Sequence, residues 1–111
     1  PAHVMVYEVT GPMFFGAADK IPHMDRKTDK SVLILRMRAV PALDITALNG
    51  LRRLWEECCR QNIQVVFSHV NEQPMSVFQK SGLLDEVGRE NFQPNIDAAL
   101  DRAAQLEGVA K

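Results

Sequence analysis

The feature that most constrains the fold is an uninterrupted apolar run at residues 32–35, which reads Val-Leu-Ile-Leu. So short a run, containing β-branched side chains and no polar residue, is typical of a strand buried on both faces, usually in a parallel sheet. Parallel strands need crossover connections, which are usually helices. The run therefore predicts an α/β domain with a mostly parallel sheet.

A long amphipathic helix is predicted after an exit loop at residues 36–43, which includes Pro41. Asp44 is a typical N-cap residue. Glu56 and Arg60 lie four residues apart in the order that stabilises a helix. Apolar side chains recur at near-helical spacing to about residue 60, which gives the helix one apolar face. The residues of this face are Ile45, Leu48, Leu51, Trp55 and Cys58.

The N-terminal segment predicts a β-hairpin. Residues 4–9 are rich in β-formers, Gly11-Pro12 marks a turn, and residues 13–15 suit a second strand that pairs antiparallel with the first. Residues 16–21 suit a short helix, and residues 23–30 form a highly charged segment typical of a solvated loop.

The C-terminal half predicts one more strand and two more helices. Residues 64–69 suit the strand. Pro74 suits the first turn of a helix for which Gly82 is the C-terminal cap, with Met75, Val77 and Phe78 on its apolar side. Pro94 opens a final helix with an apolar face. That face comprises Ile96, Ala99, Leu100, Ala103 and Leu106.

Together these segments predict a single α/β domain spanning residues 1–111. We expect a small four-stranded, mostly parallel sheet with an N-terminal β-hairpin, packed by about four helices. The 111-residue chain is 46% hydrophobic and 24% charged, which suits a folded domain with a real core. Because the chain begins at Pro1 without an initiator methionine, we expect it to be part of a longer protein.

Charge and cysteine content exclude several classes of partner. The net charge of −1 and pI of about 6.4 do not suit binding to nucleic acid or to an anionic membrane surface. No apolar stretch approaches the roughly 20 residues that span a bilayer. Cys58 and Cys59 are adjacent, so a disulfide between them is not expected, and free thiols suit a reducing compartment such as the cytosol.

The sequence predicts neither an enzyme nor a metal or cofactor site. Glycine-rich phosphate loops are missing from it. His3, His23 and His69 are scattered without metal-ligand spacing, and the adjacent cysteines are not a C-x-x-C motif. A Cys-His dyad formed in space is the catalytic alternative, and a core Cys58 with a half-buried Cys59 is the structural one.

The loop that enters the long helix is the candidate functional site. With Asp44 as the cap, Thr46 lies in the first turn, near free backbone N–H groups and the positive end of the helix dipole. This position favours a bound anion or a phosphoryl group, contacted by Asp44, Ile45, Thr46 and Ala47. The alternative is that Asp44 only caps the helix and Thr46 is an ordinary first-turn residue.

Three segments of the chain form a further pattern. They are Gly11-Pro12-Met13-Phe14-Phe15-Gly16-Ala17-Ala18; Val32-Leu33-Ile34-Leu35-Arg36-Met37-Arg38 with Val40-Pro41 and Asp44-Ile45-Thr46; and Ser81-Gly82-Leu83-Leu84-Asp85 with Pro94-Asn95-Ile96-Asp97-Ala98-Ala99-Leu100. In this order and spacing they resemble the STAS domain, in particular the C-terminal cytoplasmic STAS domain of SulP-family anion transporters. The resemblance covers nearly the whole chain, from about Val4 to about Leu106.

The resemblance implies a non-catalytic regulatory domain on the cytoplasmic side of the inner membrane, part of a secondary transporter of the sulfate or bicarbonate class. Its implied partners are the transmembrane domain of the same transporter and a cytosolic regulatory protein. An isolated monomer or weak dimer and a homodimeric parent transporter would fit this role.

The resemblance also suggests an alternative function, a free-standing anti-sigma factor antagonist switched by phosphorylation. Asp44 matches the acid of the family's D-x-[ST] motif, and Thr46 falls at its phosphoacceptor position. Ala47 departs from the pattern, because the family usually has glycine there. This departure and the segment from Gly11 to Ala18 favour the transporter domain over the antagonist.

Overall fold

The computed structural model describes residues 3–10 and 31–110, with side chains described to residue 106. Its central element is a four-stranded sheet in the order β1-β2-β3-β4, in which every neighbouring pair is parallel. The strands are β1 (Val4–Thr10), β2 (Val32–Ala39), β3 (Gln64–Ser68) and β4 (Phe92–Gln93). The helices are α1 (Ile45–Arg60), α2 (Glu72–Ser81), α3 (Leu83–Val87) and α4 (Ile96–Ala110), with a 3₁₀ turn, η2, at Arg89–Asn91.

The predicted mostly parallel sheet with about four helices is confirmed. The proposed antiparallel strand at residues 13–15, the short helix at 16–21 and the charged loop at 23–30 lie outside the described residues. Within the described part of the chain, β1 pairs with β2 in parallel, Val4 opposite Val32. The fourth strand of the sheet is the two-residue β4, which the sequence did not predict.

Strand β2 is the centre of the sheet and is longer than predicted. It continues to Ala39, so placing the exit loop from residue 36 was wrong. Beyond the apolar run the strand alternates, with Arg36 half-buried and Met37 fully buried. Residues 36–39 therefore extend the ladder although two of them are arginines.

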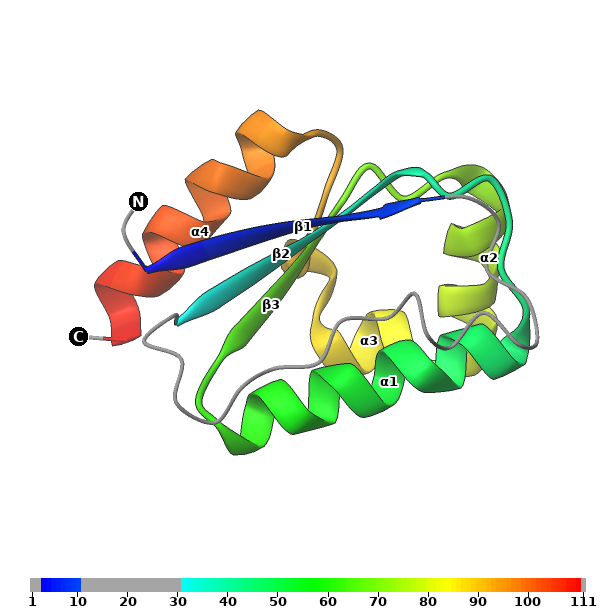
Figure 1. Ribbon diagram of the computed structural model, residues 1–111, viewed down its shortest axis with the longest axis horizontal. Helices are drawn as coiled ribbons and strands as arrows, with labels where there is room; N and C mark the ends of the chain where they lie inside the picture. Colours follow the sequence, from blue (N-terminus) through cyan, green and yellow to red (C-terminus); the bar gives the residue numbers. More distant parts are fainter. Residues whose placement is uncertain (1–2, 11–30, 111) are drawn as a thin grey trace.

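Helices α1, α2 and α3 cover one face of the sheet, and α4 covers the other (Figure 1). The first face holds the larger core, to which β2 contributes Leu33, Leu35 and Met37. Three aromatic rings cluster in it: the Phe67 ring stacks on that of Phe92, with centroids 4.9 Å apart, and meets that of Phe78 in a T-shaped arrangement at 5.1 Å. We call this face the large-core face.

The second face holds a smaller core cluster. Val32, Ile34 and Val66 of the sheet pack against Ala99 and Ala103 of α4. We call it the α4 face. No helix in the described part of the chain is long and apolar enough to cross a membrane.

The predicted end of α2 is confirmed, and the predicted start of α4 is corrected. Gly82 adopts φ 84°, the left-handed conformation that glycine tolerates, and ends α2 as predicted. The final helix begins at Ile96 rather than at Pro94, because the Asn95 side chain accepts the Ala98 N–H at 2.8 Å.

Candidate functional site at the start of helix α1

The carboxyl end of β2 delivers the chain to the start of α1, where the predicted cap is present. Val40 and Leu43 are buried and anchor the loop between them. Asp44 is extended (φ −103°, ψ 176°), and its Oδ1 accepts the Ala47 N–H at 2.9 Å. The helix therefore begins where the sequence predicted, with one of its free N–H groups satisfied by the cap.

The first turn exposes two side chains to solvent. Thr46 is exposed, so its hydroxyl is accessible, and no acidic residue shares the first turn with it. Ile45 is 57% exposed, so placing it on the apolar face of the helix was wrong. Ala47 is buried and uses its N–H in the cap, which leaves the N–H groups of Ile45 and Thr46 without a partner inside the described helix.

Two side chains at the start of α2 hold this loop, Asn71 just before the helix and Gln73 in its first turn, and sequence reasoning missed both. Asn71 donates to the carbonyl oxygens of Val40 at 2.9 Å and Arg38 at 3.1 Å. Gln73 accepts the Leu43 N–H at 2.9 Å and donates to the Leu43 carbonyl at 3.1 Å. These partners lie about 30 residues apart in sequence, so no local pattern could reveal them.

A shallow, open depression adjoins the loop. Pro41, Asn71, Glu72, Gln73 and Ser76 line its volume of about 710 Å³. The depression exposes polar side chains beside the first turn of α1, which suits contact with another protein's surface better than enclosure of a cofactor.

Among the described residues, neither cysteine has the lowered pKa of an activated nucleophile. Cys58 is buried in the large core, and burial raises the pKa of its thiol to about 12, so little thiolate forms near neutral pH. Cys59 is exposed as a residue, but the partial desolvation of its thiol raises its pKa as well. Within residues 3–10 and 31–110, no group of three histidine, cysteine or acidic side chains could hold a metal ion. His23 lies outside the described residues.

The chain is similar to known proteins over most of its length. Residues 1–99 match the family model of the STAS domain. The chain is 29% identical over 94 residues to the candidate sulfate transporter YvdB of Bacillus subtilis (strain 168), covering 80% of this chain but only 17% of that protein.

Two solved structures have the same fold at higher identity. A sulfate transporter family protein from Wolinella succinogenes is 31% identical, with a TM-score of 0.85 over 97% of this chain and 90% of that chain. A SulP transporter STAS domain from Vibrio cholerae is 30% identical, with a TM-score of 0.77 over all of this chain and 88% of that chain.

Proposed function

The chain belongs to the STAS domain family, and we propose that it is the non-catalytic regulatory domain of a SulP-type secondary transporter of sulfate- or bicarbonate-class anions. The observation that carries the proposal is the similarity to a SulP transporter STAS domain over the whole chain. A domain of this size has room for a core and a docking surface, while the path of the anion would lie in a separate transmembrane part.

We place the domain on the cytoplasmic side of the membrane. Its first partner would be the transmembrane domain of the same transporter, since this chain spans only 17% of a transporter it resembles. The exposed first turn of α1, with Ile45 and Thr46, offers a surface for a cytosolic regulatory protein. The isolated domain would be a monomer or weak dimer, and the parent transporter a homodimer.

Thr46 is the proposed regulatory position. A phosphoryl group on its exposed hydroxyl would place nearly two negative charges at the positive end of α1, near the free N–H groups of Ile45 and Thr46. Asp44 would hold the helix start in place while this happens. A bound anion could occupy the same position at Asp44, Ile45, Thr46 and Ala47.

The test is anion uptake by the intact transporter that contains this domain. We expect Thr46→Glu to change the uptake rate at normal expression, and Thr46→Val, which keeps the shape but cannot be phosphorylated, to remove any regulation. Asn49→Asp serves as the control because it adds a charge at another exposed site on α1. Unchanged uptake in both Thr46 variants would leave Thr46 with a structural role only. A coding sequence that specified this domain alone would overturn the transporter proposal and favour the anti-sigma factor antagonist.

A further inference from the structure

A row of four polar residues crosses the whole sheet at its carboxyl end. Glu8 of β1 lies opposite Arg36 of β2, Arg36 lies opposite Ser68 of β3, and Ser68 lies opposite Gln93 of β4. Side chains alternate along a strand, so Arg36 and Ser68 lie on the same face as Ile34 and Val66, which is the α4 face. The apolar rows under α4 therefore end in a polar row.

Ser68 is the unusual member of this row. It is fully buried, and its hydroxyl has no hydrogen-bond partner among the described residues. A buried hydroxyl without a partner destabilises the folded chain, so most such groups in proteins are satisfied. Its position next to Arg36 suggests a ligand that is not part of the polypeptide.

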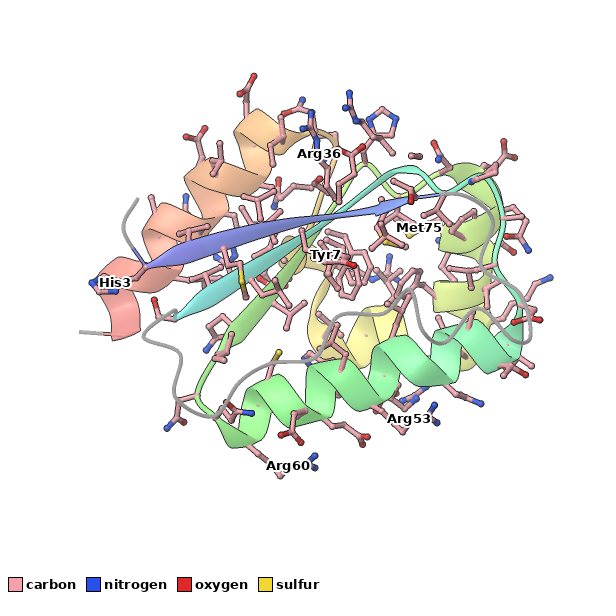
Figure 2. The ribbon with its side chains drawn as sticks, viewed as in Figure 1. His3, Tyr7, Arg36, Arg53, Arg60 and Met75 are labelled. Carbon is pink, nitrogen blue, oxygen red and sulfur yellow. The ribbon has the colours of Figure 1, made fainter. Side chains whose placement is uncertain are left out.

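Arg36 is not held by a direct ion pair in this row. Glu8, its neighbour in the row, is instead bound by Arg38 through a 3.0 Å ion pair, and this hydrogen bond is the main cause that lowers the pKa of Glu8, with Coulombic contributions from Arg38 and Arg36. Within the described residues, the Arg36 guanidinium makes no hydrogen bond or ion pair of its own. Figure 2 shows the Arg36 side chain at the side of the sheet where α4 begins.

The start of α4 supplies backbone donors at the same corner. The Asn95 side chain caps Ala98, which leaves the N–H groups of Ile96 and Asp97 without partners inside the helix. They lie at the positive end of a 15-residue helix. The Asp97 carboxylate opposes an anion here, but it is exposed and therefore screened by solvent.

The loops that leave β3 and β4 also separate at this corner. The chain passes from β3 to α2 on the large-core face and from β4 to α4 on the opposite face (Figure 1). Such a divergence at the carboxyl ends of parallel strands is where open α/β sheets bind ligands. A depression of about 510 Å³ opens between these loops and meets the row at Gln93, and His69, Pro94, Met75 and Phe92 are among its other lining residues.

We propose that this corner binds a small oxyanion of the sulfate, phosphate or bicarbonate type. Arg36 would supply the positive charge, the Ser68 hydroxyl would donate one hydrogen bond, and the N–H groups of Ile96 and Asp97 would donate others. The site is separate from the start of α1. It does not depend on the proposed transport function, since the binding is a property of the domain itself.

The test is an NMR titration of the ¹⁵N-labelled 111-residue chain with sodium sulfate, sodium phosphate or sodium bicarbonate, each against sodium chloride at equal ionic strength. We expect saturable shifts of the Ser68, Ile96 and Asp97 amides with at least one oxyanion. Arg36→Gln should weaken that binding by about tenfold or more, because it removes a charge-assisted hydrogen bond. Arg53→Gln on the exposed surface of α1 is the matched control and should leave the binding unchanged.

Ser68→Ala gives an independent readout. Without oxyanion the variant should melt at a higher temperature than the parent chain, because a buried hydroxyl without a partner has been removed. It should also lose the rise in melting temperature that the oxyanion gives the parent chain. Shifts that grow linearly without saturation, or that are the same in Arg36→Gln as in Arg53→Gln, would overturn the proposal.

Discussion

The two faces of the sheet are built from side chains of different size. The large-core face packs leucines, methionine and three phenylalanine rings under α1, α2 and α3. The α4 face is a smaller cluster, in which the fully buried side chains of α4 are two alanines, supported by the partly buried Ile96, Leu100 and Leu106. Alanine lets the helix backbone approach the sheet closely, but it removes little apolar surface from water. Most of the hydrophobic stabilisation should therefore come from one face, and the other can hold polar residues at its edge.

The largest expected effect tests the large-core face at its aromatic cluster. Phe67→Ala should lower the free energy of unfolding by about 3–5 kcal/mol, since the ring is fully buried between Phe78 and Phe92. Urea denaturation followed by circular dichroism measures the change. Ile34→Val on the α4 face is the comparison and should cost about 0.5–1.5 kcal/mol. If the two variants lost the same free energy of unfolding per removed carbon atom, the two faces would contribute equally to stability.

The next effect tests the close approach of α4. Ala103→Leu should destabilise the chain by about 1–3 kcal/mol, because Ala103 is fully buried against the sheet and a larger side chain must push the helix away. Ala104→Leu is the matched control, since Ala104 is exposed on the same helix. A cost for Ala103→Leu no greater than that of the control would show that α4 can move without penalty.

A smaller loss of stability is expected when the N-cap of one helix on each face is removed. Asp44→Ala and Asn95→Ala should each cost about 1 kcal/mol, because each removes the side chain that accepts a first-turn N–H. Amide hydrogen exchange should show the loss spreading further along α4, which rests on the smaller cluster, than along α1. No destabilisation in Asp44→Ala would count against the assigned start of α1.

The smallest expected effect on stability near neutral pH comes from ionisation of the cysteine thiols. Because the folded-state pKa of Cys58 is raised from 9.0 to about 12, its contribution to stability is complete below pH 9.0 and is lost as the pH rises towards 12. At pH 8, iodoacetamide should modify the exposed Cys59 much faster than Cys58. Mass spectrometry of a Cys59→Ser variant should find little label until urea unfolds it. Rapid labelling of that native variant would mean that the large-core face opens.

Local sequence patterns predicted the centre of this fold well. The apolar run in β2, the Asp44 cap and the Gly82 turn each depend on neighbouring residues, and all three are present. The short elements were missed because tertiary contacts define them. Helix α3 is only five residues long, and β4 exists through its pairing with β3.

The two candidate sites also differ in how far the sequence predicted them. The exposed Thr46 at a capped helix start could be read from a local motif, whereas its regulatory role stays a prediction. The polar row from Glu8 to Gln93 depends on strand register, which no short stretch of sequence specifies. In the sequence Ser68 looks like an ordinary strand-end residue, and only the structure reveals that it is buried without a partner among the described residues.

The hydrogen bonds of Asn71 and Gln73 have a mechanical consequence. Asn71 precedes α2 but makes no side-chain cap to it, and its amide binds the backbone before α1 instead. Gln73 bonds to both backbone groups of Leu43, so hydrogen bonds join the start of α2 directly to the loop that enters α1. A force applied by a partner at the tip of α1 would reach α2 without first bending the loop between β2 and α1. Such a domain would transmit a docking event as a tilt of two helices together.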